Sequence, residues 1–431
     1  MRPGAHIKAA IEVLVEVLER HRPAAVALSD WGKTHRFAGS GDRAAIGNLL
    51  YDALRRRRSL AAQMGADTPR AVVLAAAPRA LGLSVAAVLA SADGSPHAVE
   101  PLSEAERAGL SRGTPSDAPA SVRGDYPDWL EASFARALGA TAAEEGAALA
   151  RRAPVDLRVN TLKVDRDKVL KALARFAAVA TPLSPCGVRL PAPEGAARQP
   201  NVEAENAHGR GWYEVQDEGS QIAALMGCAA PREQVLDICA GAGGKTLAFA
   251  AMMRNTGQIY AYDGEPARLR PIFERLKRAD VRNTQVLRAG DSAALTALGA
   301  RFDLVFVDAP CTGTGAWRRR PDAKWRLRPA NLTQREQEQS ALLEAAAPLV
   351  KLGGRLVYAT CSLLPQENGD RIAAFLANHS GFTTLPWRES WARGIGGEAP
   401  VSADGSEATL LLTAGRHGTD GFFIAVLGRK K

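Results

Sequence analysis

The chain has 431 residues, 46% of them hydrophobic, so it is long enough for about two to four domains with substantial cores and needs no disulfide staples. It carries 55 Lys and Arg against 46 Asp and Glu, a net charge of +9. That surplus fits a polyanionic partner, although a solvated basic surface explains it equally well.

The cysteine pattern argues against a disulfide framework and against a zinc site. The cysteines are odd in number, widely scattered, and form no C-x-x-C pair: Cys186, Cys228, Cys239, Cys311 and Cys361. No signal-peptide pattern opens the chain, and no window holds about 18 uninterrupted apolar residues. We therefore expect a cytoplasmic monomer in a reducing compartment, without a metal and without a membrane partner.

Residues 1–110 predict a small helical domain. Apolar residues recur at helical spacing at Ile7, Ile11, Leu14 and Leu18 and again within residues 46–54. The arginine run at 55–58 is either a charged helix end or a patch that contacts RNA. Ser, Gly, Pro and Asp then dominate, and we place a linker at 111–125.

Residues 126–215 predict a small α+β domain. Pro127 suits the first turn of a helix, and strands are expected at 156–162, 187–190 and 212–215, with a helix over 163–176.

Residues 216–431 predict a Rossmann-like α/β domain. Apolar runs that suit strands occur at 235–239, 258–263, 284–290, 302–308 and 354–360, and helical patterns lie between them. Such alternation implies a mainly parallel sheet with helices on both faces. Two more apolar segments, at 408–413 and 422–427, can supply closing strands at one edge.

A glycine-rich turn, CAGAGGKT at 239–246, follows the first strand of this domain. A P-loop needs a glycine where Cys239 stands, and a dinucleotide fingerprint needs one where Thr246 stands. Neither phosphate-binding loop is therefore predicted. A nucleoside ligand without a phosphate chain remains, because glycines at such a turn let a ligand approach the backbone.

Three acids follow three successive strands: Asp263, Asp291 and Asp308. The spacing of Asp263 suits hydrogen bonds to ribose hydroxyls, and Asp291 is placed to reach the adenine. A solvated turn explains any single acid, but the set favours a nucleoside site. We expect its lining to comprise the three acids and the loop residues Cys239, Ala240, Gly241, Ala242, Gly243, Gly244 and Lys245.

Two cysteines also stand at strand ends, Cys311 in Pro-Cys-Thr-Gly and Cys361 in Thr-Cys-Ser. If the two strands are neighbours, both thiols lie beside one crevice. The alternative is a pair of inert, buried thiols. The basic cluster at 318–320 is expected to lower the pKa of a nearby thiol, which favours reactivity.

The motifs DAPCTGTG, RRRPDAKW, ATCSLLPQEN, DICAGAGGKT, DLRVNTLK and VQDEGSQ resemble the RsmB/NSUN family of S-adenosylmethionine-dependent RNA (cytosine-5) methyltransferases. The resemblance runs from about residue 126 to the end of the chain. Residues 1–110 resemble, more weakly, the NusB-like domain of the bacterial ribosomal branch. The resemblance implies S-adenosylmethionine as cofactor and RNA as partner, ribosomal RNA first and tRNA as the alternative.

The family mechanism gives each matching residue a role. Cys361 would attack carbon 6 of cytosine, and Cys311 would assist loss of the carbon 5 proton and release of the enzyme. Asp308 would hydrogen-bond or protonate the ring nitrogen, while Lys245 orients the site. The chain departs from the usual pattern at Ala242, Thr312 and Trp317, none of which is a reacting group.

Aromatic and basic residues follow Cys311 closely in sequence. Trp317, Trp325 and the arginines within 318–328 can stack on bases and contact phosphates beside the site, or form a charged loop around a core tryptophan. Two other functions stay open: a non-catalytic RNA-binding or ribosome-assembly factor, and a DNA cytosine methyltransferase that attacks with its Pro-Cys thiol.

Overall fold

The computed structural model describes residues 1–431, and the chain forms two compact units. The first, here called the helical unit, comprises Met1–Ala153, Ala192–Gln199 and Ala316–Leu327. The second, the sheet unit, comprises Pro154–Pro191, Pro200–Gly315 and Arg328–Lys431. These two units do not coincide with the three domains and the linker predicted from the sequence, so that division stays a proposal. No helix is long and apolar enough to cross a bilayer.

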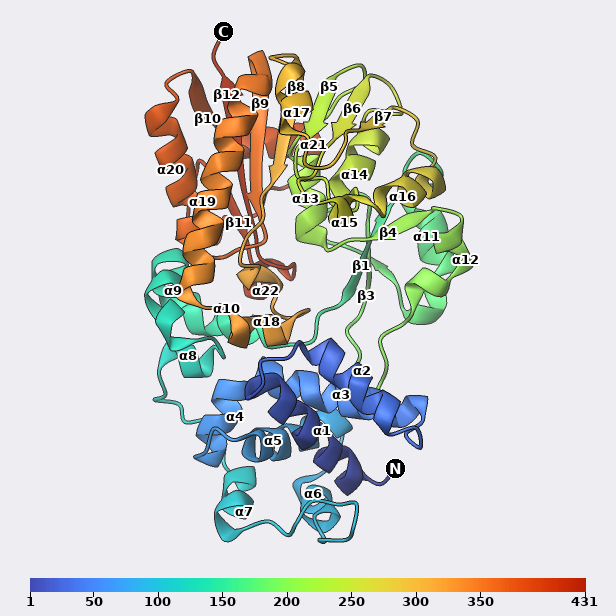
Figure 1. Ribbon diagram of the computed structural model, residues 1–431, viewed down its shortest axis with the longest axis vertical. Helices are drawn as coiled ribbons and strands as arrows, with labels where there is room; N and C mark the ends of the chain where they lie inside the picture. Colours follow the sequence, from blue (N-terminus) through green and yellow to red (C-terminus); the bar gives the residue numbers. More distant parts are fainter. The chain divides into compact units, whose positions relative to one another are not determined.

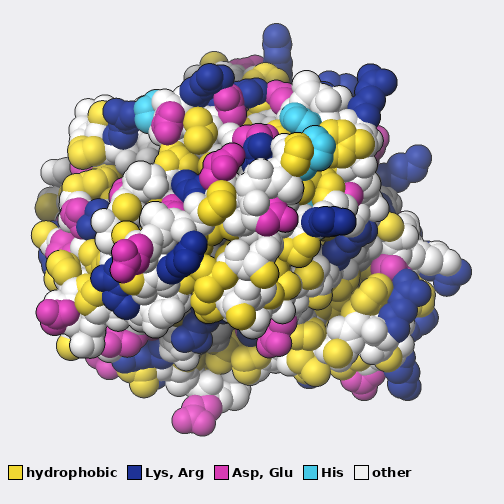
Figure 2. Space-filling model, turned by 90° about the horizontal axis from the view of Figure 1, so that it is seen from below, with side chains coloured by type: hydrophobic (Ala, Val, Ile, Leu, Met, Phe, Trp, Pro, Cys, Tyr) yellow, Lys and Arg dark blue, Asp and Glu magenta, His cyan; other side chains and the backbone are white.

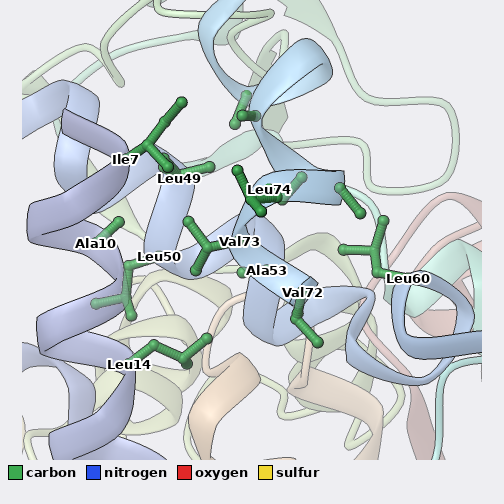
Figure 3. Close-up of a cluster of buried hydrophobic side chains, with 14 of the residues drawn as sticks. Ile7, Ala10, Leu14, Leu49, Leu50, Ala53, Leu60, Val72, Val73 and Leu74 are labelled. Carbon is green, nitrogen blue, oxygen red and sulfur yellow. The ribbon is translucent and has the colours of Figure 1, made fainter. Parts of the chain in front are cut away.

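The helical unit confirms the helical periodicity of the N-terminal region (Figure 1). Its α-helices are α1 (Pro3–Leu18), α2 (Ala24–Thr34), α3 (Ser40–Arg55), α4 (Arg57–Met64), α5 (Pro69–Leu81), α6 (Val85–Ser91), α7 (Glu104–Ser111), α8 (Ala120–Arg123), α9 (Glu131–Leu138), α10 (Ala142–Leu149) and α18 (Pro321–Arg326). The short 3-10 helices η1 (Asp128–Leu130) and η2 (Gly139–Thr141) flank α9. Apolar side chains from α1, α3 and α5 form one core, in which Ile7, Leu50 and Val73 are fully buried (Figure 3).

Two parts of this unit differ from the expectation. The arginine run at 55–58 joins two helices, because α3 ends at Arg55 and α4 begins at Arg57. The expected linker at 111–125 includes α8, and Ser121, Val122 and Asp125 are buried, so its last residues are folded structure. Pro119 stands at the N-cap position of this short helix, and within it Ser121 donates its amide to Glu131 at 3.0 Å and its hydroxyl to Asp128 at 2.8 Å.

The smaller sheet of the sheet unit is antiparallel, in the order β2-β3-β1-β4. Its strands are β1 (Val155–Val159), β2 (Val179–Ala180), β3 (Gly187–Leu190) and β4 (Tyr213–Val215), accompanied by α11 (Arg166–Ala172), η3 (Ala174–Phe176), η4 (Val202–Ala204) and α12 (Asn206–Gly209). Leu157, Val188 and Tyr213 are fully buried in its core.

The larger sheet has the order β10-β12-β9-β8-β5-β6-β7, with β11 beside β12. Its strands are β5 (Gln234–Asp237), β6 (Gln258–Ala261), β7 (Thr284–Val286), β8 (Phe302–Asp308), β9 (Val350–Thr360), β10 (Phe382–Leu385), β11 (Leu410–Leu412) and β12 (Phe422–Arg429). Strands β5 to β9 pair in parallel, and β12 pairs antiparallel with β9, β10 and β11. The Rossmann-like, mainly parallel sheet is therefore confirmed; only the short β10 was not anticipated.

Helices connect these strands (Figure 1). They are α13 (Glu218–Leu225), α14 (Gly244–Met252), α15 (Pro266–Leu269), α16 (Ile272–Ala279), α17 (Ser292–Ala297), α19 (Pro329–Ala346), α20 (Gly369–Asn378), α21 (Trp387–Gly394) and α22 (Ala414–His417), with the 3-10 helices η5 (Thr314–Ala316), η6 (Ala347–Leu349) and η7 (Pro365–Glu367). The strand order reverses between β5 and β8. In open α/β sheets such a switch point opens the crevice in which ligands bind.

Candidate active site

The two predicted thiols meet at the carboxyl ends of β8 and β9. These strands are parallel neighbours with Asp308 opposite Ala359, and the Ala309 amide donates to the Ala359 carbonyl at 2.9 Å. The chain beyond each strand then carries one cysteine to the same place. Cys311 Sγ lies 3.4 Å from Cys361 Sγ. The prediction that the two thiols lie side by side at neighbouring strand ends is therefore confirmed.

The electrostatics of Cys311 differ from the expectation. Its pKa is raised well above the ordinary thiol value, first by the hydrogen bond with Cys361, then by burial and by the negative charges of Cys361 and Glu367. The prediction that the basic cluster at 318–320 lowers the pKa of a nearby thiol is wrong for Cys311. Those arginines follow Cys311 in sequence, but they belong to the helical unit.

Glu367 holds the two cysteine loops together, and the sequence analysis gave it no role. Its carboxyl group is fully buried and accepts the Thr312 amide at 2.8 Å and the Ser362 hydroxyl at 2.5 Å. The Thr312 hydroxyl also donates to it, and Gln339 Nε2 of α19 donates at 3.0 Å. One acid thus fixes the residue after each cysteine, which sets the separation of the thiols.

Lys245 and Asp308 form an ion pair at the same edge. Lys245 lies in the first turn of α14, and its Nζ is 2.6 Å from Asp308 Oδ2. The Lys245 side chain is 10% exposed and that of Asp308 is 29% exposed, so the carboxyl group is the more accessible partner. The geometry supports an orienting role for Lys245.

The glycine loop between β5 and α14 is shaped by its backbone. Gly243 has φ +84°, and a Cβ there would lie 2.5 Å from Ile272 Cγ1, so only glycine fits. Gly241 has φ +49°, but a Cβ there would meet no atom closer than 3.8 Å. Open space therefore borders the loop at Gly241, bounded by Asp263 and Arg268.

The predicted acids lie near this loop or at helix starts. Asp263 Oδ2 accepts the Gly241 amide at 3.0 Å, which ties β6 to the loop. Asp291 caps α17 by accepting the Ala294 amide at 2.9 Å. Cys239 is buried, and burial raises its pKa well above the ordinary value, as expected of an unreactive thiol.

Asp237 is a buried acid that the sequence analysis passed over. Its side chain closes β5 and accepts the Thr246 hydroxyl at 2.7 Å, while Oδ1 has no hydrogen-bond partner. Burial raises the pKa of Asp237 to about 7, and the charges of Asp308 and Asp263 act in the same direction. The buried Asp237 carboxyl group thus holds the start of α14 through Thr246, and its raised pKa lies near neutral pH.

The aromatic and basic segment after Cys311 has a structural role in the helical unit. Trp317 and Lys324 are buried, and Lys324 Nζ donates to the Asp125 carbonyl at 2.6 Å and the Arg55 carbonyl at 3.0 Å. Trp325 Nε1 donates to the Leu54 carbonyl at 2.6 Å. These contacts favour the core-tryptophan alternative over stacking on RNA bases.

Neither of two cavities in the helical unit contains the predicted site residues. One, of about 800 Å³, is lined by residues of α1, α2 and the end of α6, and the other, of about 320 Å³, lies beside α4. No group of three or more His, Cys, Asp or Glu is placed to hold a metal ion.

Comparison with known sequences points to one family. Residues 226–428 match a family described as 16S rRNA methyltransferase RsmB/F, and residues 126–196 match the ferredoxin-like domain of RsmF/B-like methyltransferases. A Synechocystis protein described as probable ribosomal RNA small subunit methyltransferase B is 36% identical over 70% of this chain. Ribosomal RNA small subunit methyltransferase B of Sodalis glossinidius is 36% identical over 66%. The chain spans 66% and 65% of the length of these relatives, just under two thirds.

Solved structures share the fold. The crystal structure of PH0851 has a TM-score of 0.73 and 26% identity, over 100% of this chain and 99% of that one. A methyltransferase homolog protein from Pyrococcus horikoshii has a TM-score of 0.59 and 28% identity, over 72% of this chain and 97% of that one. Both sheets of the sheet unit therefore have family counterparts, and the chain belongs to the RsmB/F branch of the RsmB/NSUN methyltransferase family.

Proposed function

We propose that this protein methylates carbon 5 of a cytosine in RNA, with ribosomal RNA as substrate and S-adenosylmethionine as methyl donor. The observation that carries the proposal is the pair of thiols 3.4 Å apart beside Asp308 and Lys245. Carbon 5 of cytosine is a poor nucleophile until a thiolate adds to carbon 6, so such a reaction needs a positioned cysteine.

The glycine loop suits the cofactor. Gly241 leaves open space at the carboxyl edge of the sheet, and Asp263, already fixed by the Gly241 amide, keeps acceptor capacity for ribose hydroxyls. Asp263, Asp291 and the backbone of residues 239–244 would hold it, and the acids favour its positive charge. When bound, S-adenosylmethionine supplies the methyl group that carbon 5 accepts.

The resemblance of the Thr-Cys-Ser motif and the thiol geometry support Cys361 as the nucleophile. At a separation of 3.4 Å the Cys311 thiol can donate a hydrogen bond to Cys361 and so stabilise its thiolate form. Cys361 then forms the bond to carbon 6, and the electron pair of the carbon 5–carbon 6 double bond shifts toward carbon 5. Conjugation passes this charge to the ring nitrogen, which takes a proton from the Lys245–Asp308 pair and returns it to the pair once carbon 5 has formed its bond to the methyl group.

The hydrogen bond between the two thiols also determines when Cys311 can act as a base. Once Cys361 is bonded to carbon, it no longer accepts a hydrogen bond as a thiolate and no longer carries a negative charge. The hydrogen bond with Cys361, which does most to raise the pKa of Cys311, is thereby lost, so Cys311 loses its proton to solvent more readily. As a thiolate it takes the carbon 5 proton, the double bond re-forms, and Cys361 leaves carbon 6 with the electron pair of the broken bond.

Methylation of RNA by the intact protein and by single-cysteine variants tests the proposal. Cys361→Ala is expected to abolish transfer of label from the cofactor, because the covalent adduct cannot form. Cys311→Ala is expected to accumulate RNA bound covalently to the protein, because release fails. Cys186→Ala, which removes a half-buried thiol of the smaller sheet, is the matched control and should behave as wild type.

Labelled cytosines mapped in total RNA identify the substrate. Wild-type activity in Cys361→Ala would remove Cys361 as the nucleophile. Binding of RNA without any methylation by the wild-type protein would favour the non-catalytic RNA-binding factor, and label confined to tRNA would replace ribosomal RNA as the substrate.

A further inference from the structure

The cavity of about 320 Å³ in the helical unit is lined by four arginines: Arg56, Arg79, Arg123 and Arg151. They come from four places in the chain, at the α3–α4 junction, the end of α5, the end of α8 and the residues after α10. Their convergence follows from the packing of these helices, since no sequence motif unites them. We call this cavity the arginine pocket.

Arg56 is the exception within its own run. Arg55 pairs with Asp52 at 2.9 Å, Arg57 with Asp67 at 2.9 Å, and Arg58 with Asp128 at 2.5 Å. Arg56 makes no side-chain hydrogen bond or ion pair, although it is half-buried. A half-buried guanidinium group without a partner is unfavourable, because it has lost water and gained no acceptor.

The acid that lines the pocket does not neutralise it. Asp125 accepts the Ser59 amide and the Ser59 hydroxyl, each at 2.8 Å, one at each carboxyl oxygen. Burial is the main cause that lowers the pKa of Arg56. The positive charge of Arg79 lowers this pKa further, and the negative charge of Asp125 raises it only in part. Arg79 and Arg151 make no ion pair, and the Arg123 side chain donates only to the Ala118 carbonyl, at 3.1 Å.

The chemistry of this lining fits an anion with several oxygens. Guanidinium groups present paired donors that match phosphate geometry, and the hydroxyl groups of Thr114 and Ser116 add further donors. Pockets for small ligands have volumes of about 300–1,000 Å³, so this one suits a nucleotide unit. On the face that Figure 2 shows, Lys and Arg stand in small groups among acidic residues.

We propose that the arginine pocket binds the phosphodiester backbone of the RNA substrate. The proposal rests on the function proposed above, since it supplies the RNA. Contacts to phosphates fix the position of RNA on a protein without reading its sequence. The pocket would thus contribute affinity for the substrate and leave the chemistry at Cys361 unchanged.

The double variant Arg79→Gln/Arg151→Gln tests this in the full-length protein. Both side chains are exposed, so the fold should survive, and a thermal melt checks it. The control, Arg36→Gln/Arg112→Gln, removes two exposed arginines of the same unit that do not line the pocket. Binding of a fluorescein-labelled single-stranded RNA of mixed sequence is measured over a range of salt concentrations.

We expect the pocket variant to bind the RNA about tenfold more weakly. The slope of log affinity against log salt should shrink by about 1.4, because two phosphate contacts are lost and each contact to a single strand contributes about 0.7. KM for RNA should rise while kcat stays unchanged. Equal losses in both double variants would overturn the proposal. The proposal would also be overturned if inorganic phosphate or a mononucleotide stabilised the protein and RNA failed to displace it. The pocket would then be a site for small anions. Weaker RNA binding without any methylation by the wild type would leave this proposal standing and refute the proposed function.

Discussion

The glycine loop and the cysteine pair lie at the same edge of the larger sheet, but they are held in different ways. Gly243 takes a left-handed conformation with Ile272 packed against its backbone, so the loop is fixed by main-chain geometry. The cysteine loops are fixed by the side chain of Glu367, which accepts donors from three segments. The comparison teaches that one edge of a sheet can combine a loop shaped by its backbone with a thiol pair that a side-chain network holds in place.

Among these variants, a change that breaks the hydrogen-bond network of Glu367 should have the largest effect on the rate of methylation. Glu367→Gln replaces one acceptor oxygen by an NH2 group, which would face donors at Thr312, Ser362 or Gln339. We expect a loss of about 2–4 kcal/mol in the free energy of unfolding, because at least one buried donor is left unsatisfied. We also expect kcat to fall about 100-fold, equivalent to about 2.7 kcal/mol of barrier. Urea unfolding and single-turnover methylation measure the two effects.

Glu336→Gln on α19 is the matched control, because the Glu336 side chain makes no hydrogen bond or ion pair. If both variants lose the same activity, Glu367 does not position the thiols.

Alanine substitutions at Gly243 and Gly241 distinguish the effect of backbone strain from the loss of ligand contact in the glycine loop. Gly243→Ala combines a left-handed φ with a clash at Ile272, and we expect it to cost about 3–4 kcal/mol of folding free energy. Gly241→Ala has the φ penalty alone, about 1–2 kcal/mol, but its methyl group would enter the open space beside Asp263. Gly241→Ala should therefore lose more cofactor affinity, measured by calorimetry, than its stability loss explains. Unchanged cofactor affinity in Gly241→Ala would place the ligand elsewhere.

A further prediction concerns the pH dependence of stability and the acid Asp237 beside the loop. Burial raises the pKa of Asp237 from its ordinary 3.8 to about 7, so between these values the folded protein holds a proton that the unfolded chain has released. This contribution to stability is present below about pH 4 and is lost as pH rises through 7, at up to about 1.4 kcal/mol per pH unit. Asp237→Asn keeps an acceptor for Thr246 and should flatten that part of the stability curve. A slope unaffected by the substitution would assign it to other groups.

Features that depend on one strand and the turn after it could be predicted from the sequence. Apolar runs located β5 to β9, and Asp308, Cys311 and Cys361 follow as the residues that leave those strands. Their meeting requires only that β8 and β9 be neighbours, which the sheet order confirms. The roles of Asp291, Asp263 and the reactive thiols stay predictions until ligands are tested.

Features that depend on distant segments could not be predicted. Glu367 lies in the quoted motif ATCSLLPQEN, but its importance comes from donors 28 and 55 residues away. Trp317 and Trp325 follow Cys311 closely in sequence, which suggested a shared site. Both belong to the helical unit instead, where Trp317 is buried and Trp325 Nε1 donates to the Leu54 carbonyl. Closeness in sequence therefore does not predict a shared site where the chain passes from the sheet unit into the helical unit.

The separation of the two thiols has a redox consequence. Sulfur atoms 3.4 Å apart need to approach by only about 1.4 Å to reach the length of a disulfide bond, about 2.05 Å. Peroxide that converts either thiol to a sulfenic acid would find the other within reach, and the two would condense with loss of water. One such event would remove the attacking thiol and its partner together, and a dithiol reductant would restore both. Thiols this close together are thus open to joint oxidation, and we expect hydrogen peroxide to abolish methylation and a dithiol reductant to restore it.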